Sequence, residues 1–225
     1  MLSMTKDESV DAGRPSRQKQ VGDALRTDTR ARLLQAAERE FAARGYTGTT
    51  VTRLAAAAGV SVQTLYLAWG NKRGLLRGYL ENALAGRATT PEDAAAGLAG
   101  LPPKERLAGL ARLVATIAER AALGWTLYRD AAVVDPEIAA DWDELQLLRH
   151  RTFTRIVGDI PTTALRDGLS RAAAIDTAWT IASPETFDLL TRRLDYSVDQ
   201  FRDWLEHTLI AALLEPTAQP SRPSG

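Results

Sequence analysis

The stretch TTVTRLAAAAGVSVQTLYLAWGNKRGLL, residues 49–76, decides the fold. Gly59 divides it into two short apolar segments. Thr49 or Thr50 can accept hydrogen bonds from the free N–H groups of a first helical turn, and Ser61 can cap a second helix in the same way. The pattern predicts two short helices, joined by a tight glycine turn, which is the arrangement of a helix-turn-helix.

The second of these helices, expected over residues 62–68, has a buried and an exposed side. Leu65 and Trp69 continue the apolar stripe and are expected in the core. The outward positions, with Tyr66 at the edge, are Ser61, Gln63, Thr64 and Leu67. Gln can bond adenine, hydroxyls suit any base, and an apolar side chain can touch a thymine methyl group. This face can read base edges, although an ordinary helical hairpin gives the same pattern.

Positive charge lies beside this helix rather than on it. Lys72 and Arg73 fall in the first turn of a further helix, expected from Asn71 to residue 86, and Arg53 has the same place one helix earlier. The helix dipole disfavours cations there. An anion bound to the free N–H groups of the first turn, such as a DNA phosphate, would account for these cations.

Long helical patterns with few alternating β-branched runs indicate an all-α protein. We expect a disordered tail over residues 1–25, a helix-turn-helix domain over 26–87, a helical domain over 88–214 and a disordered tail over 215–225. The first helix is expected over 28–44 and ends at Gly45. The later helices are expected over 104–123, 125–134, 136–157, 170–182, 184–194 and 198–214.

Composition narrows the class of protein. The chain of 225 residues has no cysteine, which excludes disulfides and thiolate metal sites. Residues 1–87 hold 14 Lys and Arg against 8 Asp and Glu, a net +6, and residues 88–225 hold 14 against 20, a net −6. A basic front and an acidic rear are typical of a protein whose first part meets nucleic acid, although chance gives such a split too. No apolar run is long enough to span a membrane, so a cytoplasmic protein is expected.

The stretch quoted above resembles the helix-turn-helix of the TetR family of bacterial transcription regulators. The matching parts are Gly45-Tyr46, Thr49-Thr50, LAAAAGVS, Leu65-Tyr66 and NKRGLL from Asn71. Where the family has Phe three places after the tyrosine, this chain has Trp69, a larger side chain for the same core site. The resemblance is weaker in the second half, which looks like the regulatory domains of that family.

The resemblance implies particular roles for single residues. Tyr66 and Lys72 resemble phosphate contacts, and Thr50 resembles the contact or cap that opens the second helix. The residues expected to face the bases are Gln63, Thr64 and Leu67. The basic tail before Arg30 resembles arms that reach an adjacent groove in some members.

Family members bind DNA as dimers through their last helices, and the final helix here is strongly apolar. Its apolar residues are Phe201, Leu205, Leu209, Ile210, Ala212, Leu213 and Leu214. They present more apolar surface than one neighbouring helix would cover, which predicts a homodimer through the C-terminal helices. The alternative is that they only complete the core of one subunit.

Four of the five tryptophans lie in the second half, where they can line an apolar pocket between helices. An unidentified small, partly apolar ligand is therefore expected. The first candidates for ligand contacts are Trp125, Tyr128 and Trp179, and Arg129 and His150 are candidates for polar anchors of the ligand. Further aromatic candidates are Trp142, Phe153 and Phe187. Most aromatic residues at helical spacing are simply core, and His150 is more typical of a surface histidine.

Signals for catalysis are scarce. The two histidines lie far apart and outside any metal-ligand cluster, and no phosphate-binding glycine loop or nucleophile motif occurs. We expect no enzyme, no cofactor and no metal. The hypothesis is a TetR-like repressor that a small molecule releases from a palindromic operator in double-stranded DNA. The alternatives are a helix-turn-helix activator and a helical ligand-binding or scaffold protein without DNA binding.

Overall fold

The computed structural model describes residues 17–85 and 91–216. Within these ranges the chain is almost entirely helical, as predicted. No described helix has the length and apolar character needed to cross a membrane. The α-helices are α1 (Arg17–Arg44), α2 (Val51–Ala57), α3 (Val62–Trp69), α4 (Lys72–Ala85), α5 (Pro91–Ala96), α6 (Pro103–Ala132), α7 (Pro136–Gly158), α8 (Arg171–Ile181), α9 (Pro184–Asp188) and α10 (Val198–Leu213). A 3-10 turn, η1 (Thr162–Ala164), and a π-helical turn, η2 (Leu189–Arg193), complete the elements.

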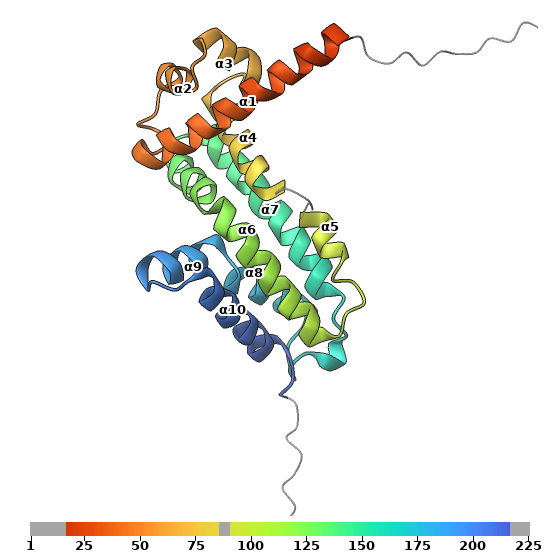
Figure 1. Ribbon diagram of the computed structural model, residues 1–225. Coiled ribbons are helices and arrows are strands. Elements are labelled where there is room, and N and C mark those ends of the chain that lie inside the picture. Colours follow the sequence, from red (N-terminus) through yellow and green to blue (C-terminus); the bar gives the residue numbers. More distant parts are fainter. Residues whose placement is uncertain (1–16, 86–90, 217–225) are drawn as a thin grey trace, which may run out of the picture.

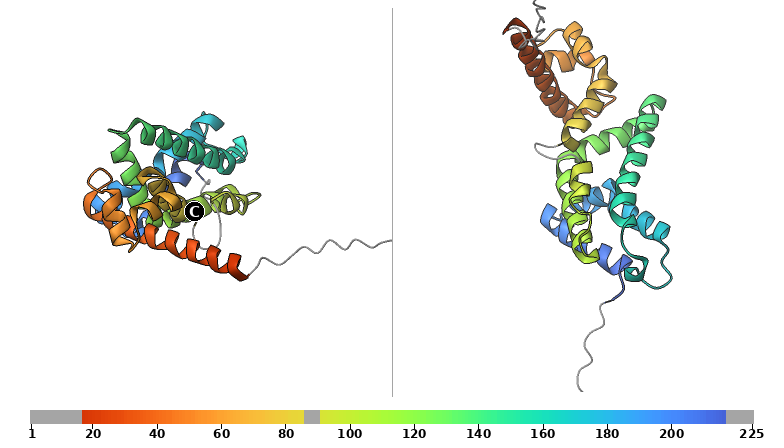
Figure 2. Two further views of the ribbon diagram at one scale, coloured as in Figure 1. Left: turned by 90° about the horizontal axis from the view of Figure 1, so that it is seen from above. Right: turned by 90° about the vertical axis from the view of Figure 1, so that its right-hand side faces the viewer.

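The helices form an elongated molecule with α1, α2 and α3 at one end (Figure 1). The long helices α6 and α7 pack together along the body, and α10 packs against both α6 and α8 at the other end. Helix α4 packs against α1 and α3 and also against α6, so it connects the two ends. The right-hand view of Figure 2 shows the helix-turn-helix at one end of the body.

The predicted helix-turn-helix is present with its predicted caps. The hydroxyl of Thr50 accepts a hydrogen bond from the Arg53 N–H, and that of Ser61 accepts one from the Thr64 N–H at 3.0 Å. Gly59 has a φ of 65°, in the left-handed region, where glycine has no steric cost. The turn between α2 and α3 therefore follows from the local sequence.

Two helix boundaries differ from the predictions. Helix α1 begins at Arg17 rather than near residue 28, so residues 17–25 of the predicted tail are helical; residues 1–16 lie outside the described residues. Helix α6 continues through Gly124, where a break was predicted. A Cβ at Gly124 would lie 2.9 Å from Cδ1 of Leu80. This glycine lets α4 approach α6 closely and does not end a helix.

Helices α7, α8, α9 and α10 start within one residue of their predicted positions, each after a residue whose side chain caps the helix. Asp135, Ser170, Ser183 and Ser197 each accept a backbone N–H in the first turn of α7, α8, α9 and α10 respectively. At α10 the Gln200 side chain accepts the Ser197 N–H in return, which completes a capping box. The helix predicted over 184–194 is split, because α9 changes to π-helical turns in η2.

The core forms two clusters, and α6 contributes to both. The first half of α6 packs with α7, α8 and α10, while its second half completes the core of α1–α4 through Leu127, Tyr128 and Ala131. Tyr128 is fully buried there, and its hydroxyl has no hydrogen-bond partner among the described residues. The core of the helix-turn-helix end thus extends across the domain boundary predicted at residue 87, and that boundary stays a prediction.

The apolar residues of α10 are mostly used inside the subunit. Phe201, Leu205, Leu209 and Leu213 are fully buried against the body of the same chain. The apolar surplus that predicted a dimer is therefore largely accounted for by the alternative, completion of the core. Ile210 and Trp204 are only partly buried.

Trp69 has room because of a glycine on the neighbouring helix. A Cβ at Gly78 would lie 2.0 Å from Cζ3 of the Trp69 indole. The guanidinium of Arg30 covers the other side of the ring, with its carbon 4.3 Å from the ring centroid. The large aromatic residue and the missing side chain at Gly78 are complementary in shape.

We expect Gly78→Ala to destabilise the protein by about 1–3 kcal/mol, because the new methyl group overpacks the indole. Thermal and denaturant unfolding would measure the change. Gly22→Ala is the control, since the nearest atom lies 3.8 Å from its Cβ, and a small gain in helix propensity is expected there. The cost of Gly78→Ala should shrink in a Trp69→Phe background, and an equal cost in both backgrounds would contradict this packing.

Candidate DNA-binding surface and ligand pocket

Helix α3 presents a mixed polar and apolar face to solvent. Leu65 is fully buried in the helix-turn-helix core, as predicted, whereas Leu67 is 82% exposed and Tyr66 47% exposed. Gln63 is also exposed. An exposed leucine beside an exposed glutamine and tyrosine is compatible with a surface that covers base edges, and these contacts stay predictions.

The hydroxyl residues near α3 serve as caps. Ser61 and Thr64 bring their hydroxyl oxygens within 2.8 Å of each other, in addition to the backbone bond at the start of the helix. Thr50 caps α2, and the exposed Arg53 lies 3.7 Å from the Glu40 carboxylate. Each hydroxyl can form further hydrogen bonds besides these, so the capping role is compatible with a DNA contact. The predicted DNA contacts of these hydroxyl residues stay predictions.

Lys72 turns towards the protein rather than away from it. Its Nζ donates hydrogen bonds of 2.9 Å to the carbonyl oxygens of Tyr46 and Thr49, and it lies 4.0 Å from the centroid of the Tyr46 ring. Burial lowers the pKa of Lys72 and raises the pKa of Tyr46 to about 12. The structure gives this lysine a role in holding the loop between α1 and α2, and a phosphate contact stays a prediction.

We expect Lys72→Met to lower the free energy of unfolding by about 1–3 kcal/mol, because two carbonyl groups lose a charged donor. Denaturant unfolding would measure this loss. Arg53→Met, which removes a more exposed cation, should change stability by at most about 0.5 kcal/mol. If Lys72 mainly met phosphate, its variant would keep full stability and instead reduce the salt dependence of DNA binding by about one charge.

Arg73 points the opposite way and joins α4 to α7. Its Nε and Nη2 donate to the two carboxylate oxygens of Asp141 at 2.7 and 2.8 Å, and its Nη1 lies 3.0 Å from Glu137. The Asp141 side chain is only 8% exposed. The Arg73 hydrogen bonds lower the pKa of this carboxyl group despite its burial. The ion pair with Asp141 accounts for a cation at this helix end without a phosphate, and a DNA contact by Arg73 stays a prediction.

We expect Arg73→Gln to cost roughly 2–3 kcal/mol of stability at neutral pH, because it leaves a buried carboxylate with weaker partners. The Asp141 pKa is depressed in the folded state, so this contribution is complete above the unfolded value near 3.9 and is lost as the pH falls through the folded value. The free energies of unfolding of the two proteins should therefore converge only as the pH falls below the folded pKa of Asp141, which lies below the ordinary value of about 3.9. Arg77→Gln, at an arginine that is 51% exposed, should cost less than about 1 kcal/mol.

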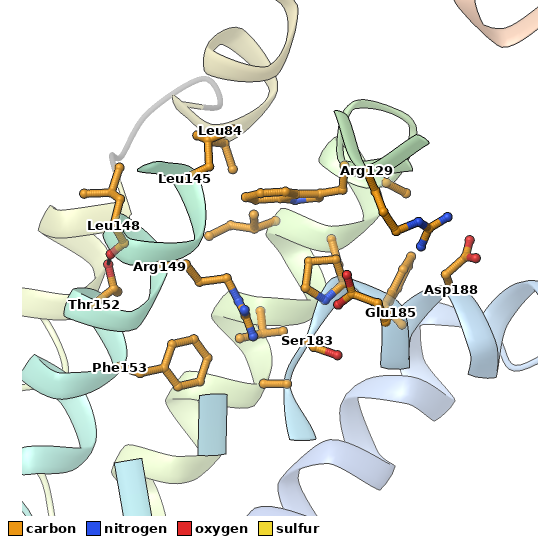
Figure 3. A pocket seen from close by; sticks show the side chains of 18 of the residues that line it. Leu84, Arg129, Leu145, Leu148, Arg149, Thr152, Phe153, Ser183, Glu185 and Asp188 are labelled. Carbon is orange, nitrogen blue, oxygen red and sulfur yellow. Dashed lines mark hydrogen bonds between the residues drawn. The ribbon is translucent and has the colours of Figure 1, made fainter. Parts of the chain in front are cut away.

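A mainly apolar pocket lies between α6, α7 and α9, with Leu84 of α4 at one side (Figure 3). The cavity has a volume of about 110 Å³. Aromatic walls come from Trp125, Trp142, Phe153 and Phe187. Charged lining residues are Arg129, Arg149, Glu185 and Asp188. The described residues contain no group of three acidic, histidine or cysteine side chains that could hold a metal ion.

Two of the five residues predicted to contact ligand line this pocket, namely the first-choice Trp125 and the polar-anchor candidate Arg129. The other three lie elsewhere. Tyr128 is fully buried in the core beside α1–α4, because it lies on another side of α6. His150 points to Asp176 of α8 at 3.0 Å, and Trp179 packs edge-on to that histidine outside the lining. None of these three residues lines this cavity, and their ligand contacts stay predictions.

Sequence reasoning missed Arg149, the neighbour of His150 on α7. Its guanidinium reaches into the pocket, between Phe153 and Ser183 (Figure 3). It donates to the Trp179 carbonyl oxygen and, at 3.1 Å, to the Gln146 side chain. The wall residues Leu145, Leu148, Thr152 and Phe153 share its helical face, and this spacing was the signal that could have identified it.

Comparison with known proteins gave one family match. Residues 33–79, which run from α1 into α4 and include the whole helix-turn-helix, match the family described as bacterial regulatory proteins, tetR family. No curated protein matches the chain by sequence.

Solved structures with the same fold cover most of the chain. NalD of Pseudomonas aeruginosa, the secondary repressor of the MexAB-OprM multidrug efflux pump, has a TM-score of 0.64 at 20% identity, over 86% of this chain and 98% of that one. KstR2 of Mycobacterium tuberculosis, a ketosteroid transcriptional regulator, has a TM-score of 0.57 at 18% identity, over 83% and 95%. FadR of Bacillus halodurans, a fatty acid degradation regulator, has a TM-score of 0.57 at 16% identity, over 80% and 97%. At these identities the likeness concerns the fold.

Proposed function

We propose that the chain is a DNA-binding transcriptional regulator of the TetR family, which the match over its helix-turn-helix supports, and that it is a repressor released from its operator by a small molecule. One observation carries the proposal: α4 begins against the helix-turn-helix and ends at the pocket. Lys72 at its start holds the loop before α2, and Leu84 near its end lines the cavity. A ligand there therefore meets the helix that positions α3.

The exposed face of α3 is the proposed reading surface. Gln63, Thr64 and Leu67 would meet base edges in the major groove, and Tyr66 would meet a phosphate, with Ser61 and Thr50 at the capped helix starts nearby. Gln63 and Leu67 suit adenine and the thymine methyl group, so sequence preference would centre on A·T steps. Helix N-termini, together with Arg53, would supply phosphate contacts.

A dimer would place two such helices on one palindromic operator in double-stranded DNA. Two half-sites one or two helical turns apart match the two-fold symmetry of a homodimer. We propose that the outer faces of α8 and α10, including the partly buried Trp204 and Ile210, form its interface. Such a regulator would act in the bacterial cytoplasm, at the nucleoid when bound to DNA, and without catalysis.

The link between ligand and DNA would run through α7 as well as α4. Asp141 holds Arg73 of α4, and its neighbour Trp142 lines the pocket. A ligand that moves Trp142 would shift Asp141 and, through it, the start of α4. Such a ligand changes DNA affinity only to the extent that it binds the two arrangements with different affinity.

Selection of bound fragments from bacterial genomic DNA by the purified protein, followed by footprinting, tests the proposal. The expected result is a protected palindrome, with affinity that falls steeply as salt rises. Binding of equal strength to all fragments would show that the protein binds DNA without sequence specificity, and would contradict the proposal that α3 reads base edges. Deletion of the gene should raise transcripts next to that palindrome, whereas a fall would indicate an activator.

We expect Gln63→Ala to change the preferred sequence and to reduce discrimination at one base pair by about 10- to 100-fold, because a bidentate contact to adenine is lost. Tyr66→Ala should instead weaken binding to all sequences alike. Selection from a randomised DNA library measures both effects. An equal loss for Gln63→Ala at specific and scrambled sites would remove Gln63 from the reading surface.

A further inference from the structure

Arg149 is a cation in an apolar pocket, and no carboxylate of the described residues forms an ion pair with it. Its two hydrogen bonds go to neutral acceptors, the Trp179 carbonyl oxygen and the Gln146 side chain. Its guanidinium carbon lies 4.9 Å from the Trp179 ring centroid and 5.3 Å from that of Phe153. Two of its five N–H groups are therefore used, which leaves donors for a further acceptor.

The other charges of the pocket are accounted for in different ways. Arg129 lies 3.3 Å from Asp130, and Asp188 lies 3.0 Å from Arg192. Figure 3 shows Arg129 and Asp188 at the side of the pocket away from Phe153. Glu185 is exposed, so water solvates its carboxylate. Among the described lining residues, the charge that is both withdrawn from solvent and without an ionic partner is the positive one on Arg149.

Removal from water is costly for this guanidinium. Burial lowers the pKa of Arg149 to about 10, although the charge of Glu185 acts in the opposite direction. The group stays charged at neutral pH. A partly buried cation without an ionic partner gains from an anion that also satisfies its free N–H groups, and a carboxylate matches the planar fork of a guanidinium.

We propose that the pocket binds a compact amphipathic carboxylate, whose anionic group pairs with Arg149 and whose apolar body lies against the aromatic walls of Trp125, Trp142 and Phe153. The inference deepens the proposed function, on which it rests, by giving the chemical class of the ligand. The cavity of about 110 Å³ fits a single ring or a short branched chain. A neutral ligand of the same shape leaves the cation unpaired, and an amine adds a second positive charge beside it.

Benzoate and hexanoate are suitable probes. Benzyl alcohol and benzylamine are the matched neutral and cationic compounds for benzoate, and hexanol and hexylamine are those for hexanoate. Titration calorimetry and tryptophan fluorescence can follow binding to the full-length protein, since Trp125 and Trp142 line the cavity. We expect at least one of the two acids to bind about tenfold or more tightly than its neutral and cationic counterparts. Equal or tighter binding of the neutral or cationic compounds would overturn the inference.

Arg149→Gln should weaken binding of the acid by about 10- to 100-fold and leave weak binding of benzyl alcohol unchanged, which shows that the pocket remains folded. Arg149→Lys keeps the charge but loses the planar fork, so an intermediate affinity is expected. Arg151→Gln, at an exposed arginine on the same helix, is the control for net charge and should match the parent protein. If Arg151→Gln weakens binding as much as Arg149→Gln, the specific role of Arg149 is refuted.

DNA binding, measured separately on the selected operator, distinguishes this inference from the function on which it rests. Intact operator binding together with no preference for the acids overturns the ligand class and leaves the regulator proposal in place. Tight, Arg149-dependent binding of an acid without any change in operator affinity supports the ligand class and contradicts ligand release. Loss of operator affinity on addition of the acid supports both.

Discussion

The ion pair between Arg73 and Asp141 is the interaction on which the arrangement of the two ends depends. It joins the first turn of α4 to α7 through two short hydrogen bonds, at a carboxylate that is almost fully buried. A buried carboxylate has few acceptable positions for its partner, so the pair fixes the register of α4 along α7. Lys72, the preceding residue, is bonded to the loop before α2. Two adjacent cations therefore hold α4 from opposite sides, and the orientation of α3 follows from where α4 is held.

This use of charge changes how the protein would meet DNA. Helix α3 carries no cation, and the two basic residues that follow it are engaged with the protein itself. Among the described residues, attraction to a polyanion would then come from exposed arginines of α1 and α2 and from the free N–H groups at helix starts. The residues on α3 would discriminate between bases rather than supply most of the affinity. Such a division favours recognition through the shape of the groove and through thymine methyl groups.

Local signals predicted most of the fold, and contacts between distant segments account for the errors. Caps such as Thr50, Ser61 and Asp135 act within one helical turn, so the sequence alone located these helix starts. The helix break predicted at Gly124 was wrong, because a side chain at this position would collide with Leu80, a residue far away along the chain. The pocket shows the same limit. An aromatic or charged residue on a helix is easy to recognise, but adjacent residues of a helix point about 100° apart, and this rotation decides whether a side chain faces ligand, core or solvent. Arg149 and His150 are adjacent in sequence, and only the arginine lines the cavity.

The continuity of α6 has a consequence for how the protein unfolds. This single helix of 30 residues, about 45 Å long, supplies side chains to both hydrophobic cores. Neither end keeps a complete core when the other is lost, so heat or denaturant should melt the molecule in one cooperative transition rather than in two. Any molecule that binds the folded pocket then also raises the melting temperature of the helix-turn-helix, by mass action alone. Thermal protection of the protein by a compound would thus report binding without showing whether the compound alters DNA affinity.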